Sequence, residues 1–301
     1  MAKSIIVILG PTASGKSALA VHLARKFNGE VISADSRQVY KGMNLGSGKI
    51  TKKEMKGVPH HLIDVASPQK RFDVTRYRRM AQASISQVIK RERTPMICGG
   101  TGFYIQAIID GIVIPEVKPD QKLRAELEKL DTKSLFEKLK KLDQRRAKNI
   151  DQSNRRRLIR ALEIVIKTGK AVPILKKQPL PYPVLMIGIK KTPEELKKLI
   201  KLRLNKRLNA GMVKEVKKLR QSGISWKKLV DFGLEYRFVA LYLQGLINRK
   251  KMIELIQKES EHFTKRQMTW FKRDERIYWI KKQSEAEKLI KDFLAKQKGR
   301  D

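Results

Sequence analysis

The sequence predicts an α/β fold in which a parallel β-sheet is flanked by helices and interrupted by a helical insertion. Three observations carry this prediction. Short apolar, β-rich runs alternate with helix-patterned stretches, the first run leads into a glycine-rich loop, and the long stretch between the third and fourth runs is patterned almost entirely as helix. The expected strands are Ser4–Leu9, Val31–Ala34, Pro95–Cys98, Val184–Ile189 and Ile277–Ile280.

The insertion is expected to span residues 116–180. Leucines recur at helical spacing from Leu123 to Leu130, and proline-containing segments precede and follow the stretch. We therefore expect a catalytic core made of residues 1–115 and 181–301, and this core contains a second helical block from about residue 193 to 275.

Charge is the most unusual feature of the composition. The 301 residues include 68 Lys+Arg against 30 Asp+Glu, a formal net charge of +38, which favours a polyanionic partner such as a nucleic acid. A bias of coding composition toward lysine is the alternative explanation. The hydrophobic content of 41% argues against wholesale disorder, and no apolar run is long enough for a membrane span. The lone Cys98 excludes an intrachain disulfide and a Cys-rich metal site, and because a strand and a glycine loop come within the first ten residues we expect no signal peptide.

The first expected strand leads directly into a phosphate-binding motif. Residues 10–17 fit G-x-x-x-x-G-K-[ST] and precede a helix-patterned stretch, so the fold prediction becomes P-loop NTPase-like. Backbone N–H groups of such a loop surround phosphate oxygens at a helix N-terminus, with the lysine on the outer phosphates and the hydroxyl on Mg²⁺. A chance glycine turn is the alternative. The candidate contacts are Gly10, Pro11, Thr12, Ala13, Ser14, Gly15, Lys16 and Ser17, the last also as the Mg²⁺ ligand.

A carboxylate and a threonine are expected beside this loop. Asp35 follows the second strand, and ligands of doubly wound sheets bind at the carboxyl ends of strands. There Asp35 can hold a metal ion through water or accept a proton, and its alternative role is to cap the following turn. The third strand ends in C-G-G-T-G, whose Thr101 presents a hydroxyl at the same edge. This strand lacks the acidic residue that a motor ATPase or helicase would use for magnesium.

Together these segments resemble the tRNA dimethylallyltransferase family. GPTASGKS, ISADSRQVYKGMNLGSGKIT, GVPHHLIDV, GGTGFYI, RRLIRALEI and KRQMTWFKR occur in the family's order and at its spacing, from about residue 4 to 280. The resemblance implies transfer of a dimethylallyl group from dimethylallyl diphosphate to N6 of adenosine 37 of tRNA, with release of diphosphate and with Mg²⁺ as cofactor. It implies binding to the anticodon stem-loop. We expect a cytoplasmic monomer that binds no membrane.

The resemblance also implies roles for individual residues. The P-loop would hold the diphosphate of the donor rather than ATP, with help from Arg207, and Asp35 would take a proton from N6. Thr101 matches a threonine that touches substrate and tRNA, so the implied catalytic set is Asp35, Thr101, Lys16 and Arg207. The implied tRNA contacts are Asp35, Ser36, Arg37, Gln38, Thr101, Arg124, Arg156, Arg157, Leu158, Ile159, Arg160, Lys265, Arg266 and Gln267.

Several of these segments have structural alternatives. Residues 154–160 could form an amphipathic helix with a solvated basic face, and Trp270 and Phe271 could be core anchors instead of surfaces on which bases stack. The His60–His61 pair has no further Cys or His nearby and is not expected to bind zinc. Two glutamates depart from the family pattern, Glu235 at a glycine position and Glu261 at an arginine position, which puts local RNA contacts in doubt.

Two other functions fit part of the sequence. A P-loop kinase for a small molecule or nucleoside would share Lys16, Ser17 and an acidic residue at Asp35, but it would not explain the charge or the insertion. A non-enzymatic RNA-binding protein could use the P-loop as a switch. Asp35→Ala separates the hypotheses, because a switch would tolerate it whereas transfer chemistry would fall by orders of magnitude with RNA affinity unchanged.

Overall fold

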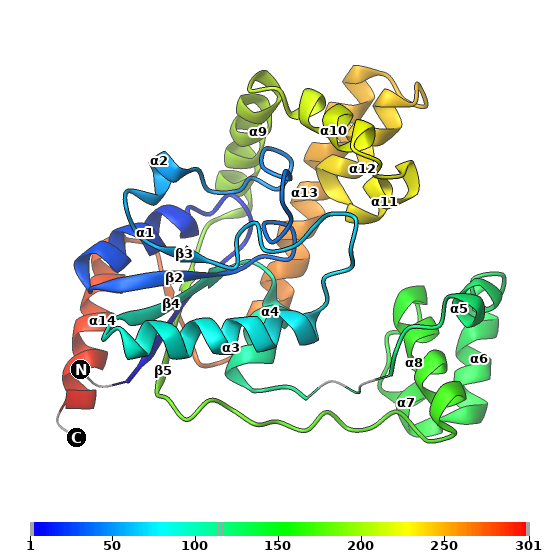
Figure 1. Cartoon of the computed structure of the whole chain (residues 1–301), viewed down its shortest axis with the longest axis horizontal. Helices are drawn as coiled ribbons and strands as arrows, with labels where there is room; N and C mark the ends of the chain where they lie inside the picture. Colours follow the sequence, from blue (N-terminus) through cyan, green and yellow to red (C-terminus); the bar gives the residue numbers. More distant parts are fainter. Residues whose placement is uncertain (1–2, 114, 116, 299–301) are drawn as a thin grey trace. The chain divides into compact units, whose positions relative to one another are not determined.

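The computed structural model describes residues 3–113, 115 and 117–298. Within these residues the core is a six-stranded sheet in the order β3-β2-β4-β1-β5-β6, and all neighbouring strands are parallel (Figure 1). The five expected strands are confirmed to within two residues at their ends. The sixth strand, β3, is a two-residue edge strand that was not predicted, because it contains no apolar run. The strands are β1 (Ile5–Leu9), β2 (Gly29–Ala34), β3 (His60–His61), β4 (Thr94–Gly99), β5 (Val184–Ile189) and β6 (Ile277–Ile280).

Helices cover both faces of the sheet. The side chains of β1 alternate between two cores, the odd-numbered residues in one and the even-numbered residues in the other, because successive side chains of a strand point to opposite faces. The even face is covered by α1 (Lys16–Lys26) and α14 (Gln283–Lys298). The odd face is covered by α3 (Val74–Lys90), α4 (Gly102–Ile109) and the second helical block. The predicted α/β architecture is therefore confirmed.

The second helical block consists of α9 to α13 and adjoins the odd face of the sheet (Figure 1). Its first helix starts with a capping box, in which Thr192 and Glu195 satisfy each other's backbone N–H groups and Pro193 takes the first helical position. The block comprises α9 (Pro193–Asn209), α10 (Met212–Gln221), α11 (Trp226–Phe232), α12 (Leu234–Leu243) and α13 (Arg249–Phe271), and the short α2 (Lys52–Met55) lies earlier in the chain.

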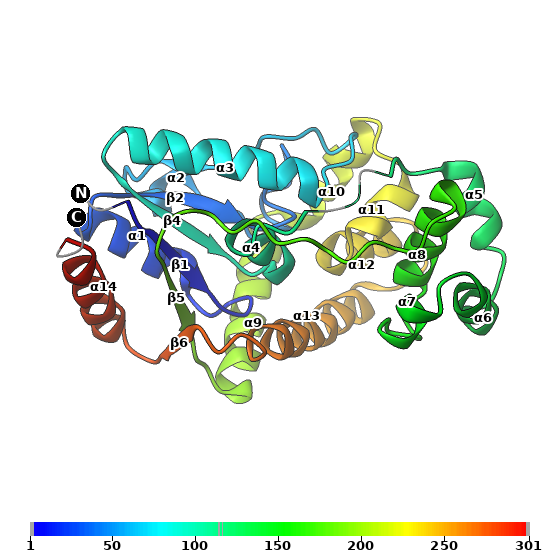
Figure 2. The ribbon, with the colours of Figure 1, turned by 90° about the horizontal axis from the view of Figure 1, so that it is seen from below.

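The chain folds into two compact units, Met1–Asp110 with Pro179–Asp301 and Gly111–Gln178. The smaller unit has its own core, with Leu135, Leu139 and Leu158 fully buried. Its helices each begin at an Asp or Asn whose side chain accepts a backbone N–H of the first turn. They are α5 (Gln121–Leu127), α6 (Thr132–Leu142), α7 (Gln144–Lys148) and α8 (Arg155–Thr168) (Figure 2). Throughout the described residues, every helix is too short or too polar to cross a lipid bilayer.

Candidate functional site

The P-loop joins β1 to α1 and leaves the N-terminus of that helix open. Gly15 adopts a left-handed conformation with φ of 89° just before α1, and the first turn has neither a side-chain cap nor an acidic residue. The Ser14 hydroxyl is buried and has no hydrogen-bond partner among the described residues. Unpaired N–H groups at a helix N-terminus attract anions, and the buried hydroxyl provides one more donor.

Lys16 contributes a positive charge within this loop. It is half-buried, and its Nζ donates to the carbonyl of Pro11 at 3.1 Å. Burial lowers the pKa of Lys16, and the neighbouring Arg203 guanidinium lowers it further, against the opposing effects of Cys98 and Asp35. A bound anion would counter both effects by stabilising the charged form.

Asp35 lies directly after β2 and uses one carboxylate oxygen to cap the following turn. Its Oδ1 accepts from the backbone N–H groups of Arg37 at 2.8 Å and Gln38 at 3.3 Å. Among the described residues, no hydrogen bond is made to Oδ2. The capping role and proton acceptance therefore use different oxygens and are compatible.

Thr101 lies at the end of the neighbouring strand. Because Ala34 of β2 pairs with Gly99 of β4, the two strand ends lie side by side, and a Cβ at Gly99 would come within 2.1 Å of the Ala34 carbonyl oxygen. The Thr101 hydroxyl accepts from the backbone N–H of Ser36 at 3.1 Å, so its own proton can be donated to a ligand. Asp35 and Thr101 are thus brought together beside the P-loop.

Gln267 of α13 connects the P-loop to the β4–α4 turn. Its Oε1 accepts from the Thr12 N–H at 2.8 Å, and its Nε2 donates to the Gly100 carbonyl at 2.7 Å. The side chain is buried, so both ends of its amide are engaged inside the protein. The neighbouring Lys265 and Arg266 are exposed.

The aromatic residues of the same segment are core anchors. Trp270 packs on the backbone of Gly102, where a Cβ would lie 2.3 Å from the indole Cδ1, and its ring meets Phe103 edge-on. Phe271 is buried in the main core. Both rings therefore pack inside the protein, Phe271 fully buried and Trp270 half-buried.

The segment after Asp35 is held against α11. The Arg37 Nε donates to the Phe232 carbonyl at 2.7 Å, and its guanidinium lies 5.8 Å from the centre of the Phe232 ring. The Gln38 side chain donates to the Gly48 carbonyl at 3.4 Å. Ser36, Arg37 and Gln38 are half-buried.

Arg207, the predicted diphosphate arginine, is largely occupied by protein partners. Its Nη2 forms an ion pair with Glu235 at 2.7 Å, and its Nη1 donates to the carbonyls of Leu45 and Gly46, both at 3.2 Å. Glu235, one of the two departures from the family pattern, is therefore a buried counter-charge. The other departure, Glu261, accepts from Gln257 at 3.1 Å.

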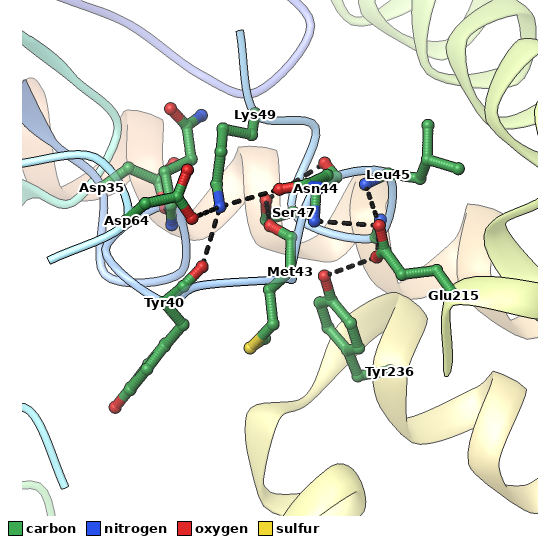
Figure 3. Close-up of polar contacts among 12 residues, drawn as sticks. Asp35, Tyr40, Met43, Asn44, Leu45, Ser47, Lys49, Asp64, Glu215 and Tyr236 are labelled. Carbon is green, nitrogen blue, oxygen red and sulfur yellow. Dashed lines mark hydrogen bonds and ion pairs between the residues drawn. The ribbon is translucent and has the colours of Figure 1, made fainter. Parts of the chain in front are cut away.

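The loop that Arg207 touches is fixed from its opposite side. Figure 3 shows the Glu215 carboxylate of α10 against this loop, accepting from three successive N–H groups and from the Tyr236 hydroxyl at 3.0 Å. Lys49 donates to the Tyr40 carbonyl at 2.8 Å and pairs with Asp64. The three N–H donors are those of Asn44 at 2.9 Å, Leu45 at 2.7 Å and Gly46 at 3.0 Å.

Sequence reasoning missed Glu215 and also Arg203, one helical turn before Arg207 on α9. The Arg203 Nη1 donates to the Thr12 hydroxyl at 3.4 Å and its Nη2 to the Gly48 carbonyl at 2.8 Å. No motif singles out either residue. The signal that could have found them lies in the loop that both residues contact, because its glycines indicate that other groups approach its backbone closely.

In the insertion, Glu163 binds two of the arginines that are predicted to contact tRNA. This fully buried carboxylate accepts from Arg124 Nε and Nη2, both at 2.7 Å, and pairs with Arg160. Leu158 and Ile159 face the unit's core, so contact with RNA in this segment depends on its arginines, of which Arg156 and Arg157 are exposed.

Oxygen groups that could take part in holding a magnesium ion lie at the P-loop and at Asp35. Among the described residues, no group of three or more His, Cys, Asp or Glu could hold a metal ion, and the ring Nε2 of His61 contacts Glu30 at 2.6 Å. Mg²⁺ keeps several waters and binds through one or two protein groups plus substrate phosphates. The Ser17 hydroxyl and the open Oδ2 of Asp35 match this limited requirement.

Comparison with known proteins identifies relatives along the whole chain. The model of the IPP transferase family matches residues 38–274. A tRNA dimethylallyltransferase of Halothermothrix orenii is 38% identical over 97% of this chain and 94% of its own, and tRNA dimethylallyltransferase 1 of Geotalea uraniireducens is 39% identical over 98% of both. The crystal structure of a tRNA isopentenylpyrophosphate transferase from Bacillus halodurans superposes with a TM-score of 0.73 at 35% identity, covering 98% of this chain and 96% of that one. A eukaryotic dimethylallyltransferase acting on tRNA superposes with a TM-score of 0.75 at 27% identity, covering 93% and 74%.

Proposed function

The chain belongs to the IPP transferase family of tRNA prenyltransferases, and on that premise we propose that it moves a dimethylallyl group from dimethylallyl diphosphate to N6 of adenosine 37 in the anticodon stem-loop of tRNA. The observation that carries the proposal is the position of Asp35 and Thr101 at neighbouring strand ends beside an open P-loop. A loop suited to a diphosphate, a carboxylate that can accept a proton and a hydroxyl donor therefore lie at one edge of the sheet.

The reaction needs both a leaving-group site and a proton acceptor. As N6 forms its bond to C1 of the dimethylallyl group, the bond from C1 to the diphosphate oxygen breaks and its electron pair leaves with the diphosphate. The N6 proton goes to the Oδ2 of Asp35. Lys16, the P-loop N–H groups and the Ser14 hydroxyl stabilise the negative charge of the departing diphosphate, and we assign Arg207 to the same site.

Magnesium is the cofactor that we assign to this site, held by Ser17 and, through water, by Asp35. When bound it neutralises charge on the diphosphate oxygens. The target base must leave its stack to reach Asp35, as bases modified by enzymes generally do. The hydroxyl of Thr101 would orient the substrate there.

The tRNA contacts are assigned to the exposed cations. Lys265 and Arg266 extend from α13 on the helix that carries Gln267, and Arg156 and Arg157 provide charge on the insertion. Phosphate contacts of this kind make affinity strongly dependent on salt. We further propose that the enzyme acts as a monomer in the cytoplasm and binds no membrane.

The test is transfer of radiolabel from dimethylallyl diphosphate to unmodified tRNA, with and without Mg²⁺. We expect Mg²⁺-dependent labelling of adenosine 37. Asp35→Asn should reduce the single-turnover rate at least 100-fold while tRNA affinity changes less than twofold. Asp292→Asn, an equal change of charge at an exposed position of α14, is the control and should leave the rate unchanged.

Two outcomes would contradict the proposal. Absence of label in RNA together with phosphate transfer from ATP would identify a kinase. Labelling that survives Asp35→Asn at the normal rate would remove this carboxylate from the chemistry.

A further inference from the structure

We propose that residues 69–79 and 217–231 together form a further binding surface for the tRNA backbone, here called the basic surface. It comprises the loop before α3 with the first turns of that helix, and the second half of α10 with most of α11. The inference rests on the proposed function, because it takes tRNA as the ligand. Neither the motifs of the sequence nor the family resemblance assigned an RNA contact to these residues.

The first support is a local surplus of charge. The basic surface carries ten Lys or Arg and two Asp in 26 residues, a net charge of +8, whereas the whole chain carries +38 in 301. One of the two carboxylates, that of Asp73, accepts from the backbone N–H of Arg76 at 3.0 Å as the N-cap of α3. A surplus of this density attracts a polyanion, which gains affinity by releasing its bound counterions.

Hydrogen bonds join the two segments into one surface. The Gln69 Nε2 donates to the Ser222 carbonyl at 3.0 Å, and the Lys228 Nζ donates to the Gln69 carbonyl at 2.5 Å. The loop before α3 is thereby held against the turn between α10 and α11. The cations of both segments therefore lie side by side in the larger unit.

The basic surface adjoins Arg37, which belongs to the predicted tRNA contacts. The Phe72 ring lies edge-on to Tyr40 with the ring centres 6.5 Å apart, and Tyr40 in turn lies 5.2 Å from the ring of Phe232. Arg37 lies over the same Phe232 ring, 5.8 Å from its centre. An RNA strand that contacts Arg37 therefore has the basic surface as its neighbour.

Two arginines of the basic surface are held in place while their donors stay free. The guanidinium of Arg76 lies 5.2 Å from the centre of the Phe72 ring, and that of Arg220 lies 5.3 Å from the centre of the Trp226 ring. Within residues 3–113, 115 and 117–298, neither guanidinium has a hydrogen-bond or ion-pair partner. Stacking restrains a planar guanidinium and leaves its N–H edge able to donate two parallel hydrogen bonds to a phosphate.

The composition of the basic surface favours RNA over a protein partner. Of the large apolar side chains that are exposed among the described residues, none lies in the basic surface. A stable protein interface has an apolar core inside a polar rim, whereas an interface with nucleic acid is more polar and strongly positive. The exposed side chains here include those of Lys70, Arg71, Arg79, Arg220 and Lys227.

The test is filter binding of unmodified tRNA to the full-length chain over a series of salt concentrations. Arg76→Gln combined with Arg220→Gln should weaken binding about 10-fold and lower the slope of log affinity against log salt by about 1.5, because two phosphate contacts are lost. Arg76→Lys combined with Arg220→Lys should fall between that variant and the wild type. Lys288→Gln combined with Lys291→Gln, the same loss of charge at exposed positions of α14, is the control and should change affinity less than twofold.

A measurement on the wild-type chain does not depend on the folding of any variant. Ultraviolet cross-linking of the tRNA complex, followed by mass spectrometry, should place RNA adducts in peptides from residues 69–79 and 217–231. Peptides from α14 are the internal control and should carry none. Adducts that occur at Lys265 or Arg266 but in neither segment of the basic surface would overturn the inference.

The failure of the inference is distinct from that of the proposed function. Wild-type tRNA affinity and salt slope in the double glutamine variant, with transfer to tRNA intact, would remove the basic surface and leave the proposed function standing. Unchanged tRNA affinity together with weakened binding of poly-glutamate would assign the surface to an acidic protein and would also overturn the inference. If the wild-type chain neither binds nor labels tRNA, both fail.

Discussion

Replacing Glu163 with glutamine should make local unfolding of the insertion more favourable. The carboxylate has no exposed surface and accepts from the Asp120 N–H at 2.7 Å, from two nitrogens of Arg124 at 2.7 Å, and from Arg160. Burial alone would raise the pKa of Glu163, but hydrogen bonds from Arg124, from the Asp120 backbone and from Arg160 lower it to about 2. Glutamine keeps the shape and loses the charge, so two arginines would lose their buried counter-charge.

The magnitude follows from the pKa. A fall from the usual 4.5 to about 2 is about 2.5 pH units at 1.36 kcal/mol each, or about 3 kcal/mol of stability. Removing one partner of a buried ion pair lowers the free energy of unfolding by a similar amount. Since the folded pKa is the lower one, this stability is fully present above about pH 4.5 and is lost as the pH falls through about 2.

Hydrogen exchange followed by mass spectrometry measures the stability of the insertion separately from that of the rest of the chain. At pH 7, a loss of about 3 kcal/mol should speed exchange about 100-fold in peptides from residues 117–178, with peptides from residues 3–110 unchanged. Glu137→Gln, an equal change of charge at an exposed position of α6, is the control and should leave exchange unchanged. The difference between wild type and Glu163→Gln should stay constant from pH 8 to about 5 and decline below.

Less than a threefold change in exchange within the insertion would refute the assignment of Glu163 as the buried charge that holds it together. An equal acceleration in residues 3–110 would refute the local character of the effect. Either result would also remove the argument that Glu163 orients Arg124 and Arg160.

The other predictions concern packing, RNA affinity and the loop at α10. Gly102→Ala would push a Cβ against the Trp270 ring, 2.3 Å from Cδ1, and should lower stability by about 1–3 kcal/mol in thermal melts; an unchanged Tm would mean that the ring moves freely. Joint replacement of Lys265 and Arg266 by glutamine should reduce the slope of log affinity for tRNA against log salt by about 1.5, and filter binding with an unaltered slope would exclude them as phosphate contacts. Glu215→Gln weakens the three N–H contacts of the loop and should raise the KM for dimethylallyl diphosphate at least fivefold at constant tRNA affinity; an unchanged KM would separate the loop from the diphosphate site.

Local features of the site were accessible from the sequence. The P-loop and the positions of Asp35 and Thr101 at strand ends follow from short stretches of chain, in which the residues that form a feature are covalent neighbours. The capping role of Asp35 also follows from neighbours, because its partners are two and three residues away. The edge strand at His60–His61 was missed because two residues cannot show an alternating pattern.

Partners that are distant in the chain were not accessible. Gln267 contacts Thr12 across 255 residues of sequence and also binds Gly100. The family resemblance implied a tRNA contact for Gln267, but nothing in the sequence pointed to these two protein partners. For Trp270 and Phe271 the pattern allowed both stacking on bases and packing in the core; in the structure Phe271 is buried in the main core and Trp270 is half-buried against Gly102.

The sequence by itself determined the parallel sheet, the helical insertion and the phosphate loop, because apolar periodicity and a contiguous motif set them locally. Tertiary structure alone decided how the surplus of positive charge is used. Two arginines of one helix differ by a single turn, yet Glu235 neutralises Arg207 and no carboxylate pairs with Arg203 among the described residues. Which arginine is paired with a carboxylate depends on which segments the fold brings together, and charge pairing between distant segments leaves no periodic signal in a sequence.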